Sequence, residues 1–386
     1  METKQPTKTE RSPKMHLLQN LSYFQSQVQQ YLFPSMEETL DPLLDSHKKV
    51  LLAIETVKVE RFLSYFHYRG RPPHSRVRLA NTFIAKAVLN ISTNEELHER
   101  LIIDKGLRRI CGWETIKGIP SLSTFSRAFT EFTEIGLPQK IHKMLIDGIY
   151  SGEVTGHLSR DATDITERAG HIKSKKNYTR TKFGGAPHQE KPTRCERQAS
   201  GKMTLEEMIE ELPKERNIGR KASSKGRIFH WVGYKLHVDV TDDMIPISCI
   251  MSSASLHDSQ AAIPLSLMSE QRVFSFYELM DKAYDTKAIK GFMESSGKKA
   301  IISTCPRGKG KKEEYVRELR AKSHLKIKYS EDIRFKHRTV AERFFSNLKE
   351  NHLGRIIWVK GHAKVLCHIM FGIVALTVKQ LYNMLN

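Results

Sequence analysis

The apolar residues of this chain of 386 amino acids change their spacing near residue 154. Before that point they recur three or four residues apart, as in Leu18, Leu21, Phe24 and Val28, which is typical of amphipathic helices. After it, runs of alternating apolar and polar residues appear between the helical segments. The resulting order of strand, hairpin, helix, strand, helix, strand and helix predicts one mixed sheet covered by helices. We therefore expect an all-helical N-terminal domain over residues 1–150 and an α/β domain over residues 151–386.

The bounds of the individual segments follow from the same patterns. Helices are expected at 77–89, 94–103, 286–295 and 335–349, and strands at 154–165, 229–240, 245–251, 273–279 and 299–304. Two basic stretches, at about 171–227 and 307–328, have little apolar periodicity apart from a short helix near 203–211. Each of them is either a solvated loop or a segment that contacts phosphates.

The chain carries a large excess of positive charge. Its 63 Lys and Arg residues against 43 Asp and Glu give a formal net charge of +20. This excess favours a polyanionic partner, and nucleic acid before a membrane, because no basic amphipathic anchor stands out. The apolar run 365–378 is too short to span a bilayer and contains His368, so we expect a buried helix there.

Cysteine usage and the N-terminus indicate the compartment. The five cysteines are scattered without a C-x-x-C pair, which indicates a reducing environment and neither a zinc site nor a disulfide framework. Residues 1–15 are polar and are expected to be disordered, and they lack the apolar stretch of a signal peptide. We expect a soluble, cytoplasmic protein without a membrane partner.

One expected helix carries three charges on a single stripe. Over residues 335–349, Arg338, Glu342 and Lys349 lie together, to the side of an apolar row formed by Val340, Phe344 and Leu348. A carboxylate flanked by two cations suits a metal site that also binds phosphates. The alternative is a solvated helix face with one ion pair.

Two aspartates lie at predicted strands, Asp161 inside the first and Asp281 just after the strand at 273–279. A carboxylate in a strand interior costs desolvation energy unless a partner compensates it. A pair of Mg²⁺ ions held by these two groups and by Glu342 would provide that compensation and would support phosphodiester chemistry. Three other carboxylates are rivals: Asp164 is expected on the opposite face of the strand, Asp258 at the start of a helix, and Asp285 at a helix cap.

The N-terminal part contains a possible DNA-reading element. Ser121 follows a proline and is expected to begin a helix with an apolar face of phenylalanines, with Arg127 pointing outward. Two helices joined by a turn here fit a helix-turn-helix that reads DNA, and they fit plain helical packing equally well.

At this point the sequence resembles the DDE-type transposases of bacterial insertion sequences. The motifs that carry the resemblance are IPSLSTF (119–125), RDAT (160–163), GYKLH (233–237), ASLHD (254–258), MDKAYD (280–285) and the helix around Glu342 followed by Lys360 and Gly361. One branch of the family has a signature of Tyr, two residues, Arg, three residues, Glu, six residues and Lys. Arg338, Glu342 and Lys349 match it, and Phe335 stands where the signature has tyrosine.

The resemblance implies a fold, an activity and a site. It implies a ribonuclease-H-like catalytic domain in which Asp161, Asp281 and Glu342 bind Mg²⁺, or Mn²⁺ in its place, while Arg338 and Lys349 position DNA phosphates. It also implies a protein that binds the ends of its element, cleaves there and transfers the strands to target DNA, as a homodimer or larger oligomer at the nucleoid. Two alternatives stay open: a non-catalytic basic DNA-binding protein derived from a transposase, and a metal-dependent nuclease without strand transfer.

Overall fold

The structure is a computed structural model. It describes residues 13–40, 42–63, 73–150, 153–168, 192–222, 227–303, 309–324, 329–355 and 357–385. The expectation of disorder at the N-terminus falls mainly on residues 1–12, which lie outside the described residues, as do residues 171–191 of the first basic stretch.

The N-terminal part is helical, as expected. Its helices are α1 (Pro13–Gln27), η1 (Val28–Leu32), α2 (Phe33–Leu40), α3 (Asp45–Val57), η2 (Val59–Phe62), α4 (Arg76–Val88), α5 (Asn94–Ile103), α6 (Lys105–Ile110), η3 (Ile116–Gly118), α7 (Leu122–Glu134) and α8 (Leu137–Tyr150). Helices α4 and α5 begin at side-chain caps: Ser75 accepts a hydrogen bond from the amide of Arg78, and Thr93 accepts one from the amide of Glu96. The predicted helices 77–89 and 94–103 are therefore confirmed.

A six-stranded mixed sheet forms the second part. Its strands are β1 (Val154–Thr166), β2 (Asn217–Ala222), β3 (Ile228–Thr241), β4 (Pro246–Ser253), β5 (Phe274–Met280) and β6 (Lys299–Ile302). The order is β2-β3-β1-β5-β6, and β4 pairs with the second half of β3. The pairs β1–β3 and β3–β4 are antiparallel, whereas β1–β5 and β5–β6 are parallel. This arrangement confirms the predicted mixed sheet and the predicted hairpin.

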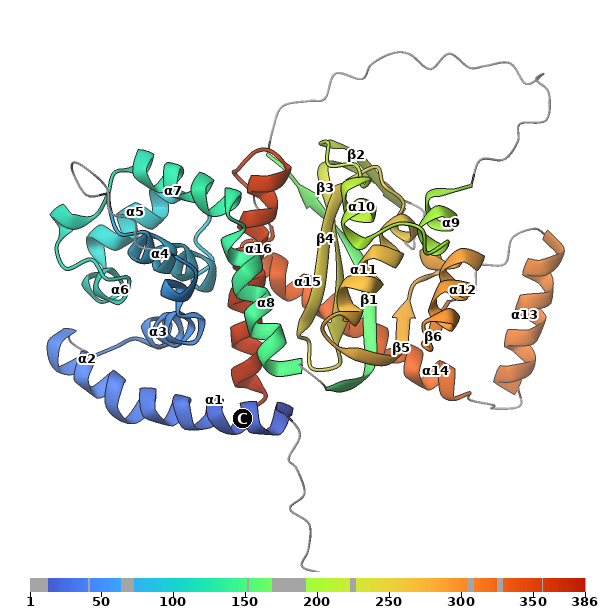
Figure 1. Ribbon diagram of the computed structural model, residues 1–386, viewed down its shortest axis with the longest axis horizontal. Coiled ribbons are helices and arrows are strands. Elements are labelled where there is room, and N and C mark those ends of the chain that lie inside the picture. Colours follow the sequence, from blue (N-terminus) through green and yellow to red (C-terminus); the bar gives the residue numbers. More distant parts are fainter. Residues whose placement is uncertain are drawn as a thin grey trace, which may run out of the picture.

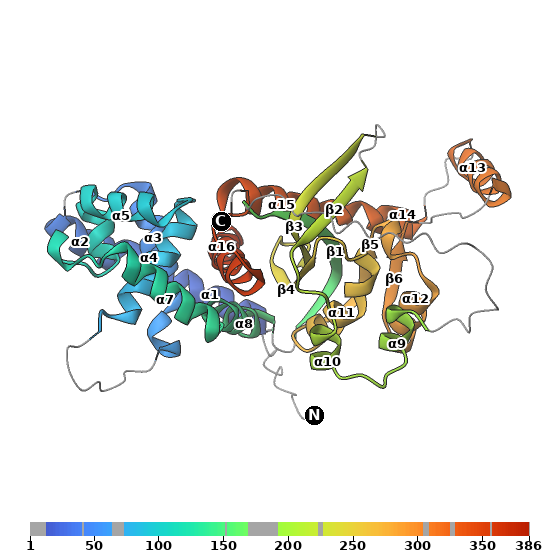
Figure 2. The same cartoon turned by 90° about the horizontal axis from the view of Figure 1, so that it is seen from above.

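Helices cover both faces of the sheet (Figures 1 and 2). The helical elements of this part are α9 (Arg194–Ala199), α10 (Leu205–Glu210), η4 (Asp258–Ala261), α11 (Ala262–Glu270), η5 (Lys282–Tyr284), α12 (Lys287–Ser295), α13 (Lys309–His324), α14 (Ser330–Phe335), η6 (Lys336–Arg338), α15 (Thr339–Asn351) and α16 (His362–Asn383). Of these, α13 stands apart from the sheet (Figures 1 and 2). On one face, α15 and α16 pack on alternate residues of β3 such as Leu236 and Val238. On the other face, α11 buries Leu265 against Ile250 of β4.

The last helix joins the two parts of the molecule. Phe371 and Val374 of α16 belong to the core of the N-terminal helices, and Ile369 and Ile373 belong to the core beneath the sheet. Among the described residues, α16 is the one helix long and apolar enough to cross a membrane, but 89% of its apolar window is buried inside the protein. It is therefore a core helix, as the sequence predicted.

Three segments differ from expectation. The helix expected from residue 335 begins at Thr339. Residues 330–338 instead form a short separate helix, α14, and the single 3-10 turn η6. The stretch 307–328 was expected to be a loop but contains α13, whose acidic residues alternate with basic ones and pair one turn apart, as Lys322 does with Glu318. The first basic stretch contains strand β2, which is defined by its pairing with β3.

Candidate active site

Asp161 and Asp281 lie at the same level of two neighbouring parallel strands, Asp161 within β1 and Asp281 just beyond the end of β5. Arg160 of β1 pairs with Met280 of β5, and the two aspartates are the residues that follow. Asp281 lies just beyond its strand and begins η5, where its carboxylate accepts a hydrogen bond from the amide of Lys282 at 2.7 Å. The parallel register thus places both carboxylates at one edge of the sheet, at the position that their sequence contexts predicted.

Glu342 reaches the same edge from helix α15. The helix is fixed to the sheet by Val340, Phe344 and Leu348, which are almost fully buried against β1 and β3. Glu342 lies in its first turn, outside this apolar row. The apolar stripe predicted from the sequence is therefore confirmed, although the helix begins four residues later than expected.

Arg338 joins two of the three carboxylates. One guanidinium nitrogen donates to Glu342 Oε1 at 2.7 Å, and the other lies 3.9 Å from Asp161 Oδ2. A cation thus stands between the helix carboxylate and the strand carboxylate. The structure brings Asp161, Arg338 and Glu342 into one cluster, with Asp281 on the adjacent strand end.

The carboxylate of Asp161 favours a cationic partner. Burial raises its pKa to about 6, and the charges of Arg338 and Lys221 oppose that rise, whereas Asp258 adds to it. An anion that is costly to bury gains when a cation approaches. Because the three donor groups are all carboxylates, the oxygen ligands that hard cations prefer, their chemistry fits a divalent metal. Their oxygens do not all lie within 4.8 Å of one another, so a bound metal would have to draw them together.

The three rival aspartates are each paired with a lysine. Asp164 lies 2.9 Å from the ammonium of Lys349, Asp258 lies 2.8 Å from Lys235, and Asp285 lies 2.6 Å from Lys290. Asp258 begins η4, as expected. The expectation that Asp285 caps the following helix is wrong, because the side chain of Thr286 accepts the capping bond from the amide of Ile289.

Lys349 therefore points toward Asp164 and β1, two turns along α15 from Glu342. Phe335 lies beside Arg338 of the acid cluster, with its ring centre 5.6 Å from the guanidinium carbon. Tyr329 is half exposed and lies beneath the ammonium of Lys322, 4.7 Å from its ring centre.

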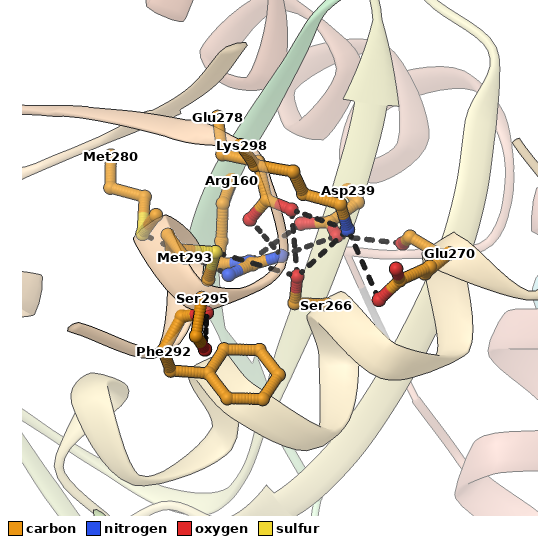
Figure 3. A network of polar contacts seen from close by, with 11 residues as sticks. Arg160, Asp239, Ser266, Glu270, Glu278, Met280, Phe292, Met293, Ser295 and Lys298 are labelled. Atoms are coloured by element: carbon orange, nitrogen blue, oxygen red, sulfur yellow. Dashed lines mark hydrogen bonds and ion pairs between the residues drawn. The ribbon is translucent and has the colours of Figure 1, made fainter. Parts of the chain in front are cut away.

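A buried ionic network surrounds Arg160, the residue that precedes Asp161 (Figure 3). Arg160 is fully buried and donates to both carboxylate oxygens of Asp239, at 2.8 and 2.7 Å, while Glu278 lies 2.8 Å from it. Lys298 adds a second cation, 3.4 Å from Glu278, and Ser269 donates to Asp239. Because these charges come from β1, β3 and β5, they tie together the three strands that set the level of Asp161 and Asp281.

Sequence reasoning missed this network. Its signal was present, since Arg160, Asp239 and Glu278 are charged residues inside otherwise apolar strands. The pairing of Arg160 with Asp239 and Glu278 could not be predicted from the sequence, because both acids are far from Arg160 along the chain.

A second polar cluster anchors the turn that carries Arg338. His157 donates from Nδ1 to Asp242 at 2.7 Å, since its Nε2 accepts from Arg334 at 3.1 Å. The ring of His337 stacks on that of His157 with centres 4.9 Å apart, and Ser159 donates to the backbone carbonyl of His337. His157, Asp242 and His337 are the one group of three within metal-ligand distance of one another among the described residues, and the group is distinct from the acid cluster.

Arg127 lies on α7, within the N-terminal helices. Phe125 and Phe132 of this helix are fully buried, and Phe129 is nearly so, which confirms the predicted apolar face. The Arg127 guanidinium donates to the carbonyl of Ser123 and the hydroxyl of Thr124, both at 3.3 Å on its own helix. Its side chain therefore lies along the surface of α7.

The mixed sheet, with carboxylates at neighbouring strand ends and a third on a helix packed across them, is the ribonuclease-H-like arrangement of DDE enzymes. Comparison with protein-family models gives two matches, a transposase domain (DUF772) over residues 35–131 and a transposase DDE domain over residues 207–378. No curated protein and no solved structure matches the chain. The two models together cover most of the chain, which belongs to the DDE-type transposases of the insertion-sequence type. Transposases of this kind act on DNA and generally use a divalent metal.

Proposed function

We propose that this protein binds the ends of its own insertion sequence, cleaves the DNA there and joins the freed 3′-hydroxyls to target DNA. The observation that carries the proposal is the placement of Asp161, Asp281 and Glu342. Two of them directly follow the register pair Arg160–Met280 on adjacent parallel strands, and Arg338 bridges the third to Asp161. The family assignment supports the same reaction class.

The roles of the residues follow from their chemistry. Asp161, Asp281 and Glu342 would hold the divalent metal, Mg²⁺ or Mn²⁺, which supplies Lewis-acid activation of the attacking hydroxyl and stabilisation of the leaving oxygen. Arg338 orients the carboxylates of Asp161 and Glu342 and presents guanidinium donors that match a phosphate oxygen pair. Lys349 adds a point charge on the same helix for the adjacent DNA backbone.

The N-terminal helices complete the proposal. Residues 1–150 form the part that recognises the element's ends, with Arg127 on the exposed side of α7 as a candidate DNA contact. The division at residues 150 and 151 is part of this proposal. Because an element has two ends, we further propose that the protein acts on DNA as a homodimer or larger oligomer, in the cytoplasm at the nucleoid.

The test uses the full-length protein and a duplex that carries the inverted repeat found beside the gene. Nicking at the repeat end that depends on Mg²⁺ is the expected result, and its absence with either Mg²⁺ or Mn²⁺ favours the non-catalytic alternative. A second assay offers a pre-cleaved end and a plasmid. Joined product supports the transposase, whereas nicking without joining identifies a nuclease.

A further inference from the structure

Strand β2 and the first half of β3 form a two-stranded arm that extends beyond the sheet. Residues 217–222 pair with 228–233, and this segment is called the arm. The pairing of β1 with β3 stops at Gly233, and that of β4 stops at Tyr234. Within the part of the chain that the structure describes, residues 228–232 therefore have β2 as their one strand partner, and the arm stands out from the body in Figure 2.

The arm is stiffened at its base. The indole of Trp231 lies so close over Gly219 that a Cβ there would be 2.2 Å from the ring, and its Nε1 donates to the carbonyl of Tyr234 at 3.0 Å. At Gly233, with φ of 150°, the chain passes so close to the carbonyl of Ile165 that a side chain would not fit. The arm is thus held in one conformation before any partner binds.

The surface of the arm combines exposed apolar side chains with positive charge. Ile218, Ile228 and Phe229 are 42, 47 and 57% exposed. Residues 216–230 contain five Lys or Arg residues and no Asp or Glu, and Arg220 and Lys221 are exposed. Large apolar groups that face solvent on a projecting hairpin indicate a binding surface. The absence of acidic residues indicates that the partner is a polyanion.

The arm begins beside the strand that carries Asp161. At its base, Gly233 pairs with Thr166, which lies five residues along β1 from Asp161. Lys221 pairs directly across the arm with Phe229, so both side chains occupy the same face. That face therefore presents a cation and a large apolar group together.

We infer that the arm is a DNA-binding element that grips the duplex beyond the end of β1, to one side of the phosphodiester bond held at the acid cluster. Arg220 and Lys221 contact phosphates, and Phe229 packs against sugars and bases in the adjoining groove. The inference rests on the proposed function for the position of the scissile bond. A second copy of the chain, paired along the free edge of β2, is the competing occupant.

Binding of the full-length protein to two duplexes tests the inference. One duplex carries the inverted repeat beside the gene, the other is scrambled, and binding is measured without metal over a range of salt. Arg220→Ala/Lys221→Ala should weaken binding to both duplexes at least tenfold. It should also reduce the slope of log K against log salt by up to about two, since each lost phosphate contact removes roughly 0.9. Phe229→Ser should weaken binding with an unchanged slope, because no charge is lost.

The matched control is Lys287→Ala/Lys379→Ala, which removes two exposed cations outside the arm, on α12 and α16, and should leave affinity near the parental value. An equal loss in the arm variant and the control would overturn the inference, as would parental binding by both arm variants. Arm variants that lose self-association without DNA while keeping DNA affinity would identify the second copy as the occupant. Because binding is measured without metal, failure of the parent to nick DNA would contradict the proposed function and leave this result intact.

Discussion

Asp161 of β1 and Asp281, just beyond β5, occupy equivalent positions on neighbouring parallel strands, each one residue after the pair Arg160–Met280. The two residues are therefore adjacent in the sheet, although 119 residues lie between them in the chain. Arg338 bridges Glu342 to Asp161, while the ligand oxygens of Asp161, Asp281 and Glu342 do not all lie within 4.8 Å of one another.

The first prediction concerns these three acids. Asp161→Asn, Asp281→Asn and Glu342→Gln should each reduce nicking of end DNA by at least a thousandfold, because each removes a charged metal ligand with little change of shape. Binding to the same duplex, measured without metal, should stay within a few-fold of the parent. The control is Asp285→Asn, whose carboxylate is paired with Lys290. Parental nicking by Asp161→Asn together with loss in Asp164→Asn would reassign the first ligand.

The second prediction concerns Lys349. Lys349→Ala should slow nicking of pre-bound end DNA at least tenfold at both low and high salt, because a charge that acts on a held phosphate is poorly screened. Asp164→Asn removes the partner 2.9 Å away and leaves the lysine charge available, so nicking should persist. A small loss that disappears at high salt would show that Lys349 belongs to a solvated helix face.

The third prediction concerns the buried network. Arg160→Met should lower the free energy of unfolding by about 3–5 kcal/mol, because it leaves Asp239 and Glu278 buried with one cation fewer. Adding Asp239→Asn to that variant should recover part of the loss, since it removes one of the uncompensated charges. Urea titrations of the parent, the single and the double variant measure both quantities. Equal stability of parent and Arg160→Met would contradict the assigned role.

The fourth prediction concerns acid stability. Burial lowers the pKa of His142 to about 3, and its ring bonds to the carbonyl of Pro246 at 2.9 Å between α8 and β4. A histidine whose pKa is lower in the folded than in the unfolded protein contributes its full stabilisation above the unfolded pKa of about 6.5. That contribution is lost as the pH falls toward the folded pKa of about 3. At pH 4.5 the loss from His142 should be about 3 kcal/mol.

His142→Gln should therefore unfold less readily than the parent between pH 6 and 4, relative to each protein's own stability at pH 7.5. Thermal unfolding over this range measures the difference. Part of the acid sensitivity should remain, since burial also lowers the pKa of His237 to about 4 and that of His368 to about 3. A pH dependence identical to that of the parent would contradict this assignment.

The fifth prediction concerns recognition of the element's ends. If α7 contacts DNA, Arg127→Ala should weaken binding to end DNA by three- to tenfold. Among the described residues, the Arg127 guanidinium donates only to Ser123 and Thr124 of its own helix, so it can also reach a DNA group. An equal loss on scrambled DNA indicates a phosphate contact, and a loss on end DNA alone indicates base readout. Unchanged binding to both duplexes would indicate that α7 packs against the other helices and does not contact DNA through Arg127.

Much of the secondary structure was predictable because it depends on residues close together in the chain. The alternating pattern around Asp161 and the pattern ending at Met280 gave strands β1 and β5, and the spacing of Val340, Phe344 and Leu348 gave α15. The start of α15 was predicted wrongly because it depends on contacts with β1 that the local sequence does not show. His337 is held against β1 through its ring contact with His157 and its carbonyl bond from Ser159, and the helix begins only beyond it.

The sequence by itself determined the alternation of elements, the helical N-terminal part, the mixed sheet and the identity of the candidate acids. Only the tertiary structure decided that Arg338 lies between Asp161 and Glu342, that Lys349 pairs with Asp164, and that β2 projects as an arm. The physical reason is the range of the interactions. Periodicity and capping act over a few residues, whereas these contacts depend on the register between strands and helices that are far apart in the chain.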